Sequence, residues 1–253
     1  MPLLHQFLFD TPWVKLLKAD HRDRLLAETR ERTLQRGALV CQTGQRVEYW
    51  KGVIEGLVKV SVVSAEGRTS TLTGLANGAW FGEGPVLRAN TWDFDGVAMR
   101  ETRIALVPRA TFEWLMDVSP EFNRFLIVHL NERLAQYVSI IEAERLEVAE
   151  TRVARCLAWL FNPVLYPSVG SRLELSQQEI GYLAGVPRQR VNQALKMMSE
   201  AGLIGVRYGA IEVLDLPALE RFKASLAHSI LNSPGVVING ASAARAVAIN
   251  RVP

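Results

Sequence analysis

The spacing of apolar residues divides the chain into segments of different periodicity. Residues 11–29 have helical spacing, whereas from about Thr33 to Pro108 short apolar runs are separated by glycines. Within this second region residues 58–62 alternate between valine and a polar residue, and a turn at 65–67 leads into residues 69–73. Period-two alternation around a turn predicts a β-hairpin. Several short strands with regular turns predict an antiparallel β barrel or jelly roll.

A long helix is predicted to follow, from Pro120 to about Val148. Ser119 precedes the proline as a cap, and no further Gly or Pro interrupts the segment. Its apolar residues recur at spacings of three and four, which is the a/d pattern of a coiled coil. They are Ile127, Leu130, Leu134, Tyr137 and Ile141. The pattern favours a parallel dimerisation helix over the alternative of an ordinary core helix.

A second, mostly helical domain is predicted after residue 150. Apolar spacing predicts a helix over residues 152–161, and a Pro/Gly loop follows as far as residue 171. Short alternating runs between residues 204 and 213 predict a two-stranded wing. The tail from Ala224 is rich in alanine and lacks periodicity, so we expect a poorly ordered extension.

These segments combine into an α+β chain of four parts. We expect an antiparallel β jelly-roll sensor domain with N-terminal helices at 1–118, a long dimerisation helix at 119–149, a C-terminal winged helix-turn-helix domain at 150–223 and the tail at 224–253. A length of 253 residues suits one large or two medium domains, and a hydrophobic content of 49% is enough to form their cores.

Residues 176–200 carry the local signals of a helix-turn-helix. Ser176 and Glu179 have the spacing of a capping box at the start of a first helix. Gly185 can adopt the positive φ that a tight turn needs. Pro187 then fits the first position of a second helix.

The second helix of this motif is predicted to have one apolar and one polar face. Val191, Leu195 and Met198 face inward. The outward face carries basic and amide side chains and no acidic residue. It consists of Arg188, Gln189, Asn192, Gln193 and Lys196, flanked by Arg190. Because arginine can bind guanine, and glutamine or asparagine can bind adenine, we expect this face to bind double-stranded DNA in the major groove. A solvated helix in a helical hairpin would leave this combination of cap, turn and basic face unexplained.

Composition adds weaker constraints. The formal net charge of +3 is compatible with a nucleic-acid partner without establishing one. Cys41 and Cys156 lie far apart and form no metal-spaced cluster, so we expect reduced thiols, no metal and no cofactor. The start of the chain lacks the basic region of a signal peptide, and no apolar run reaches the ~18 residues of a membrane span. We therefore expect a cytoplasmic protein with no membrane association.

Three stretches resemble the Crp/Fnr superfamily of bacterial transcription regulators. Residues 176–191 match that family's helix-turn-helix pattern closely. Residues 78–83, Gly-Ala-Trp-Phe-Gly-Glu, resemble the G-x-x-[FI]-G-E segment of its cyclic-nucleotide-binding jelly roll, and residues 54–62 with Gly56 resemble the paired strands before it. The resemblance extends over about residues 33–222.

The resemblance implies a homodimer that binds a palindromic DNA site, with RNA polymerase as a further partner and a small-molecule effector whose identity is unknown. It also implies base contacts from Arg188, Gln189 and Gln193. In the family's cyclic-AMP-responsive member the position of Gln189 is Glu and that of Gln193 is Arg. Glutamate only accepts hydrogen bonds whereas glutamine also donates, so we expect different base preferences.

The resemblance places a ligand pocket at Gly82, Glu83, Asp93, Phe94 and Tyr137. The Gly-Glu pair holds the ribose in cyclic-nucleotide binders, but the Arg-Ser pair that holds the phosphate falls here on Asp93 and Phe94. The residues that contact the purine fall on Tyr137 and Val138. An acidic residue facing a phosphate is unfavourable, so we expect a sensor that does not respond to cyclic AMP. The alternative is a cyclic-nucleotide-responsive regulator whose phosphate pocket has been rebuilt around Arg88.

Two rival functions fit the sequence less well. A cupin-type metalloenzyme would place histidine ligands on the barrel strands, but residues 29–109 contain no histidine, so we do not expect an enzyme. A cyclic-nucleotide-binding signalling module without a DNA role would leave residues 176–213 unexplained. The sequence therefore predicts a DNA-binding transcription regulator.

Overall fold

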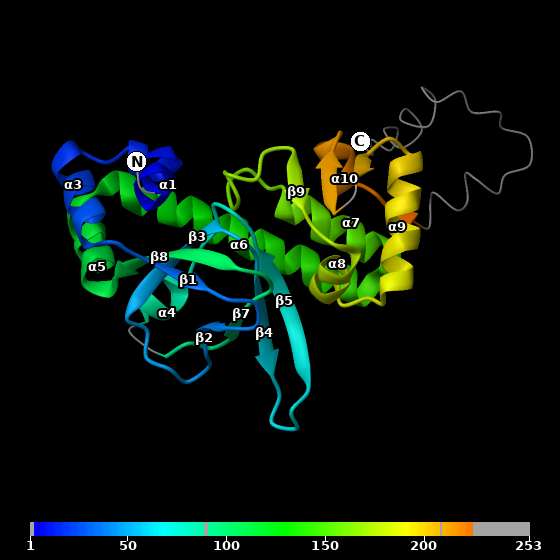
Figure 1. Ribbon diagram of the computed structural model, residues 1–253, viewed down its shortest axis with the longest axis horizontal. Coiled ribbons are helices and arrows are strands. Elements are labelled where there is room, and N and C mark those ends of the chain that lie inside the picture. Colours follow the sequence, from blue (N-terminus) through cyan, green and yellow to red (C-terminus); the bar gives the residue numbers. More distant parts are fainter. Residues whose placement is uncertain (1–2, 89–90, 208, 225–253) are drawn as a thin grey trace, which may run out of the picture. The chain divides into compact units, whose positions relative to one another are not determined.

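The chain folds into two compact units, which are described separately (Figure 1). The strand unit comprises residues 1–137 and 162–170, and the helical unit comprises residues 138–161 and 171–253. The computed structural model describes residues 3–88, 91–207 and 209–224. Of the tail predicted to be poorly ordered, all but Ala224 lies outside the described residues.

Three short helices open the strand unit: α1 (Leu3–Asp10), α2 (Pro12–Lys15) and α3 (Ala19–Glu28). The helical spacing of residues 11–29 is thus confirmed, and α1 extends the helical region toward the N-terminus. Trp13 is buried in an aromatic cluster, where its ring centroid lies 5.4 Å from that of Trp50 and 5.1 Å from that of Phe122. This cluster joins the N-terminal helices to the strands and to the long helix.

The predicted antiparallel strands form two four-stranded sheets. Their orders are β1-β8-β3-β6 and β2-β7-β4-β5. The strands are β1 (Arg30–Leu34), β2 (Leu39–Cys41), β3 (Tyr49–Glu55), β4 (Val58–Val63), β5 (Thr69–Leu75), β6 (Trp80–Phe81), β7 (Asp95–Ala98) and β8 (Thr102–Pro108). The predicted hairpin is confirmed, because β4 pairs with β5 in antiparallel register, with Val60 opposite Thr73.

The expectation that the two strands in residues 54–62 pair with each other is wrong. β3 pairs with β8 and β6, whereas β4 belongs to the other sheet. Gly56 lies between them with a φ of 117° and lets the chain cross from one sheet to the other. Hydrophobic alternation identifies strands well, but it does not say which sheet each strand joins.

Three further helices follow or interrupt the strands: α4 (Glu83–Leu87), α5 (Arg109–Val118) and α6 (Pro120–Leu146). The long helix begins where it was predicted to begin, and the hydroxyl of Ser119 accepts a hydrogen bond from the backbone N–H of Phe122 at 3.2 Å. Along α6, apolar side chains are exposed at Ile127, Leu130, Leu134, Val138 and Ile141. Tyr137, predicted to belong to this series, is half-buried instead.

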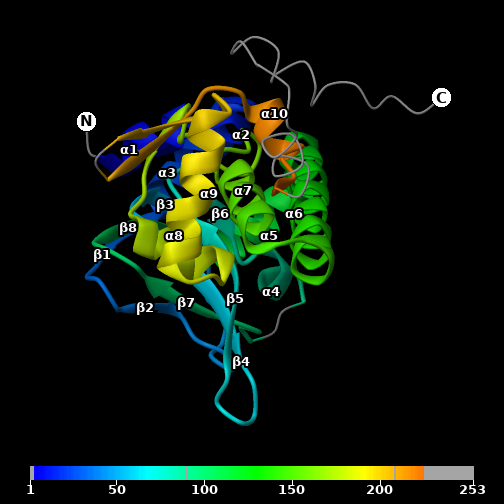
Figure 2. The same ribbon diagram turned by 90° about the vertical axis from the view of Figure 1, so that its right-hand side faces the viewer.

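The helical unit contains the three helices of the DNA-binding prediction. Its elements are α7 (Ala149–Leu160), β9 (Arg172–Glu174), α8 (Gln177–Ala184), α9 (Arg188–Glu200), β10 (Ile204–Arg207), β11 (Ala210–Val213) and α10 (Leu216–Glu220). Helices α7, α8 and α9 pack against one another (Figure 2). The predicted wing is present as β10 and β11, and β9, which was not predicted, adds a third strand beside β11. Tyr208, which falls within the segment predicted to form the wing, lies outside the described residues.

Candidate nucleic-acid interface

The first helix of the helix-turn-helix is held by the predicted capping box. The hydroxyl of Ser176 accepts from the backbone N–H of Glu179 at 3.2 Å. The Glu179 carboxylate accepts in return from the backbone N–H of Ser176 at 2.8 Å. The helix ends at Gly185, whose φ of 62° gives the predicted left-handed turn. Pro187 is the N-cap residue of the second helix and does not occupy its first helical position as predicted, because its ψ of 146° is extended.

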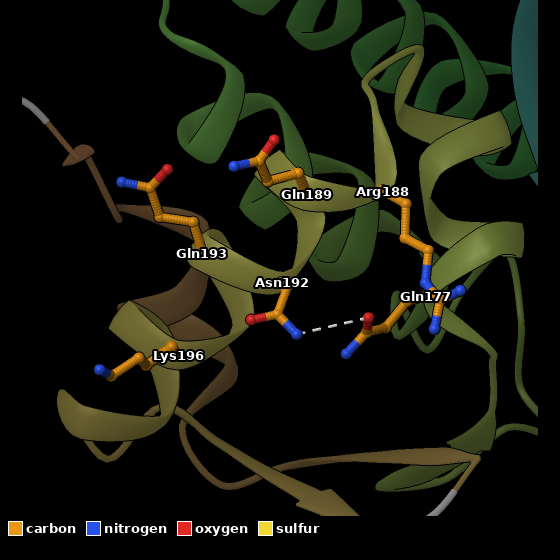
Figure 3. Close-up of a pocket in the computed structure, with 6 residues that line it drawn as sticks. All are labelled: Gln177, Arg188, Gln189, Asn192, Gln193 and Lys196. Carbon is orange, nitrogen blue, oxygen red and sulfur yellow. Dashed lines mark hydrogen bonds between the residues drawn. The ribbon is translucent and has the colours of Figure 1, made fainter.

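Helix α9 separates its side chains into the two predicted faces. Val191, Leu195 and Met198 are buried, and Ala194 is buried with them. The opposite face is exposed. Five of the predicted DNA-binding residues line an open hollow of about 620 Å³ together with Gln177 of α8 (Figure 3). They are Arg188, Gln189, Asn192, Gln193 and Lys196. We call these five residues the reading face.

The reading face presents hydrogen-bonding groups that its own chain leaves largely unused. Arg188 forms no ion pair or hydrogen bond with any of the residues that the structure describes. Lys196 lies 3.8 Å from Glu200, one turn further along the helix. In Figure 3, Arg188 and Lys196 lie toward opposite ends of the hollow, with Asn192 between them. The face therefore offers two cations and three amides to a partner.

Gln177 was not among the predicted site residues. Its side chain approaches the reading face from α8, and its Oε1 accepts a hydrogen bond from Nδ2 of Asn192 at 3.5 Å (Figure 3). The two residues are fifteen positions apart, so only the packing of α8 against α9 brings them together.

Arg190 is directed differently from the other predicted residues. Its guanidinium donates to Oε2 of Glu150 at 2.9 Å, and the Glu150 side chain is only 3% exposed. Arg152, which lies on the same helix as Glu150 (α7), donates to the carbonyl of Ala184 at 3.0 Å, at the end of α8. Helix α7 thus contacts both helices of the motif through polar side chains of its first turn.

In the strand unit, Glu83 is buried near His129 of helix α6. Its carboxylate lies 3.7 Å from Nε2 of His129, and its second oxygen has no hydrogen-bond partner among the described residues. The same His129 nitrogen lies 3.1 Å from the carbonyl oxygen of Trp80, so it carries the proton that it donates. Burial lowers the pKa of His129, the Arg133 charge lowers it further and the Glu83 charge opposes this. The imidazole is therefore neutral near pH 7.

At the position expected to hold a phosphate, the nearby arginine is already paired with a carboxylate. Asp93 forms an ion pair with Arg88, and both side chains are more than half exposed. Phe94 contacts Trp92 edge-on, with ring centroids 5.3 Å apart. Arg88 is thus already paired with the acidic residue expected at the phosphate position.

Trp92, which the sequence did not single out, lies directly against the predicted ribose position. A Cβ atom on Gly82 would lie 2.4 Å from the Trp92 ring, so only glycine allows this approach. The ring is almost completely buried, and the ammonium of Lys51 lies 5.0 Å from its centroid. Burial lowers the pKa of Lys51. Aromatic rings and one buried cation therefore lie beside the predicted ribose position.

A buried polar network surrounds Arg133 on α6. Its guanidinium donates to Gln136 at 2.8 Å and to the hydroxyl of Tyr166 at 3.2 Å. That hydroxyl donates in turn to the carbonyl of Gly74 at 2.8 Å. Tyr137 stands beside this network, and burial raises its pKa. The buried polar side chains on the strand-unit part of α6 therefore form hydrogen bonds mainly with residues of that unit.

Two family models match the chain at these two regions. The model described as "Cyclic nucleotide-binding domain" matches residues 31–119. The model described as "Crp-like helix-turn-helix domain" matches residues 151–222, which include the capping box and the reading face. The chain belongs to the Crp/Fnr family of transcription regulators. As a Crp/Fnr regulator with a helix-turn-helix domain, it is a DNA-binding protein and not an enzyme.

Relatives and solved structures agree with this assignment. The transcriptional regulator LdrP of Thermus thermophilus is 30% identical over 171 residues, covering 66% of this chain and 83% of LdrP. The cAMP-activated global transcriptional regulator Vfr of Pseudomonas aeruginosa is 26% identical over 200 residues, covering 75% of this chain and 92% of Vfr. The structure of FixK2 from Bradyrhizobium japonicum is similar in fold, with a TM-score of 0.61, 20% identity and coverage of 77% of this chain and 97% of FixK2.

The Crp/Fnr assignment excludes the rival of a signalling module without a DNA role, because the second model covers the helix-turn-helix domain. Within the part of the chain that the structure describes, no helix combines the length and hydropathy needed to cross a membrane. The site residues that sequence reasoning missed are Gln177, Glu150, Trp92, Lys51, Arg133 and Tyr166. Each acts through a partner distant in sequence.

Proposed function

We propose that this Crp/Fnr regulator binds a palindromic DNA site as a homodimer and does so without cyclic AMP. The observation that carries the proposal is the exposed reading face of α9, which has two cations, three amides and no carboxylate between residues 186 and 199. In helix-turn-helix proteins, residues in the N-terminal part of the second helix contact base edges in the major groove. Residues 150–223 are the DNA-binding domain in this proposal.

The residues of the reading face have separate roles. Arg188 binds a guanine through O6 and N7, and Gln189 and Gln193 contact neighbouring bases. Lys196 lies on the last turns of α9 and binds a phosphate, which adds affinity without sequence preference. Arg190 holds α9 on Glu150 of α7 and is a positioning residue, whereas the sequence had placed it beside the DNA-binding face.

Dimerisation takes place through α6, within residues 119–149. Ile127 is 69% exposed and Leu134 is 62% exposed, and exposed apolar residues recur along the helix to Ile141. A second copy of the helix would remove this stripe from water. Val138, which is exposed, takes the place in the stripe that was predicted for Tyr137. A two-fold dimer presents two reading faces about one DNA turn apart and hence binds a palindrome.

The sensor domain, residues 1–118, does not take cyclic AMP as its effector. The Vfr relative is described as cAMP-activated, but here the phosphate position holds Asp93, and its neighbour Arg88 is paired with it. Trp92 lies against Gly82, where the ribose of a cyclic nucleotide would be expected to bind. Burying a phosphate beside a carboxylate whose neighbouring arginine is already paired is strongly unfavourable.

Selection of DNA by the purified full-length chain tests this proposal. Protein is mixed with a random-sequence DNA pool in the absence of nucleotide, and bound fragments are sequenced. We expect a palindromic motif whose half-site centres are separated by about one helical turn of DNA, roughly 10–10.5 base pairs, or by a multiple of it. Enrichment that requires cyclic AMP would contradict the nucleotide-independent part, and the absence of any motif would contradict sequence-specific binding. Adding RNA polymerase to the selected DNA tests the further expectation that the regulator contacts it.

A further inference from the structure

One amide of the reading face is bonded to a residue outside the recognition helix. Gln177 is the first residue of α8, yet its side chain lines the same hollow as the α9 side chains (Figure 3). Its Oε1 accepts from Nδ2 of Asn192 at 3.5 Å. Gln177 is half-buried, so the residue remains partly accessible to a ligand.

We propose that Gln177 fixes the orientation of the Asn192 amide and thereby determines which base is preferred at one position of each half-site. The proposal rests on the proposed function, because it assumes that α9 lies in the major groove. It adds a specificity-determining residue that makes no base contact of its own.

The hydrogen-bonding capacity of an amide explains how this works. An asparagine side chain has two N–H donors and a carbonyl acceptor. Binding the edge of adenine uses the carbonyl for N6 and one N–H for N7. These two groups lie on the same side of the amide, and the second N–H points away from them. A bond from that second N–H to Gln177 therefore leaves the adenine-binding edge of Asn192 free and held in one orientation.

The DNA backbone selects this arrangement over its reverse. In the reverse arrangement Nε2 of Gln177 would donate to Oδ1 of Asn192, and the asparagine would present only donors to the base. Gln177 lies in the first turn of α8, and helix N-termini in such proteins approach DNA phosphates. A phosphate oxygen only accepts hydrogen bonds, so the Gln177 NH₂ group turns toward it and Oε1 turns toward Asn192. The phosphate contact thus sets Asn192 to bind adenine.

Selection from a random-sequence DNA pool with full-length variants tests the coupling. For Gln177→Ala we expect the preference for adenine at one position of each half-site to fall about tenfold. Asn192→Ala should lose the preference at the same position, and the double variant should lose no more than Asn192→Ala alone. Gln178→Ala is the matched control, because Nε2 of Gln178 donates to the hydroxyl of Tyr182 at 2.9 Å within α8. Its motif should equal that of the wild type.

Gln177→Glu separates the two roles of the residue. A carboxylate still accepts from Asn192 but repels the phosphate, so the adenine preference should persist while affinity for all sequences falls. Loss of that preference in Gln177→Glu, or an unchanged motif in Gln177→Ala, would overturn the coupling. The wild type is selected in the same pool. A wild type without any motif would overturn the proposed function, whereas a normal wild-type motif with an unchanged Gln177→Ala motif would overturn only this inference.

Discussion

The two units treat their polar side chains in opposite ways. On the reading face of α9, cations and amides are exposed and most have no protein partner among the described residues. Around Glu83 and Arg133 in the strand unit, the same types of group are buried and bonded to one another or to backbone carbonyls. The difference indicates a surface ready for a ligand in one unit and an interior organised around its own residues in the other.

This contrast has an energetic basis. Leaving a buried polar group unpaired costs roughly 1–3 kcal/mol, whereas an exposed group is hydrated at little cost. Exposed donors can therefore remain without a protein partner until DNA binds. Buried donors must form hydrogen bonds within the fold or with a bound molecule. The second oxygen of Glu83 and Nδ1 of His129 have no partner among the described residues. They are the points at which the comparison between the two units can be tested.

The largest expected effect concerns the exposed stripe of α6. Leu134→Asp places a charge in an apolar contact, so sedimentation should show a monomer where the wild type is a dimer at micromolar concentration. Affinity for the palindrome should fall by more than about 100-fold, because each half-site is then bound separately. Val63→Asp, which also introduces a charge at an exposed apolar residue but in a β-strand, should remain dimeric. A wild type that sediments as a monomer would contradict dimerisation through α6.

The next effect concerns the reading face itself. Arg188→Ala should lose roughly 1–3 kcal/mol of binding free energy and relax the preference at one position in each half-site. The free energy of unfolding should stay within about 0.5 kcal/mol of the wild type, because the side chain is exposed and unpaired among the described residues. Titration of labelled DNA and urea unfolding measure the two quantities. An unchanged selected motif would show that the reading face has been assigned to the wrong residues.

Arg190→Ala should lower the stability of the fold, whereas Arg188→Ala should weaken DNA binding and leave stability unchanged. It leaves the Glu150 carboxylate buried without its ion-pair partner, so the free energy of unfolding should fall by about 1–3 kcal/mol. The double variant Arg190→Ala with Glu150→Gln should recover part of this loss. If Arg190→Ala weakens binding equally on all DNA sequences without changing urea unfolding, Arg190 is a phosphate contact after all.

A smaller effect is expected from pH, through His129. Its pKa is lowered in the folded chain, mainly by burial, and has its ordinary value in the unfolded chain. Above the ordinary pKa both states are neutral, and as pH falls below it only the unfolded state gains the proton. The free energy of unfolding should therefore fall with acidification, by at most about 1.4 kcal/mol per pH unit. His129→Gln should flatten the profile, and equal slopes for both proteins would contradict this account.

The smallest expected effect is that of cyclic AMP, which should be undetectable. Calorimetry of the purified protein with cyclic AMP and cyclic GMP should show no binding at micromolar concentrations, and neither should change DNA affinity. A micromolar dissociation constant that Arg88→Ala abolishes would show that Arg88 can leave Asp93 and serve a phosphate. The rebuilt-pocket alternative would then be correct.

The sequence predicted local features more completely than partnerships. Ser176, Glu179 and Gly185 act on neighbours within a few positions, so spacing alone identified the cap and the turn. The heptad pattern placed the exposed side of α6 but put Tyr137 on it, because its burial depends on strand-unit neighbours. Gln177, Glu150 and Trp92 have roles only because separate elements pack together. Spacing along one element carries no information about such contacts.

The segment 162–170 has a consequence for modular design. It belongs to the strand unit although the chain on both sides belongs to the helical unit. It supplies Tyr166, whose hydroxyl accepts from Arg133 and Gln136. A fragment cut at the conventional boundary near residue 150 would keep those two side chains and lose their partner. Grafting this sensor onto a different output domain therefore requires the transplanted piece to carry residues 162–170 with it, as a separate insertion in the recipient sequence.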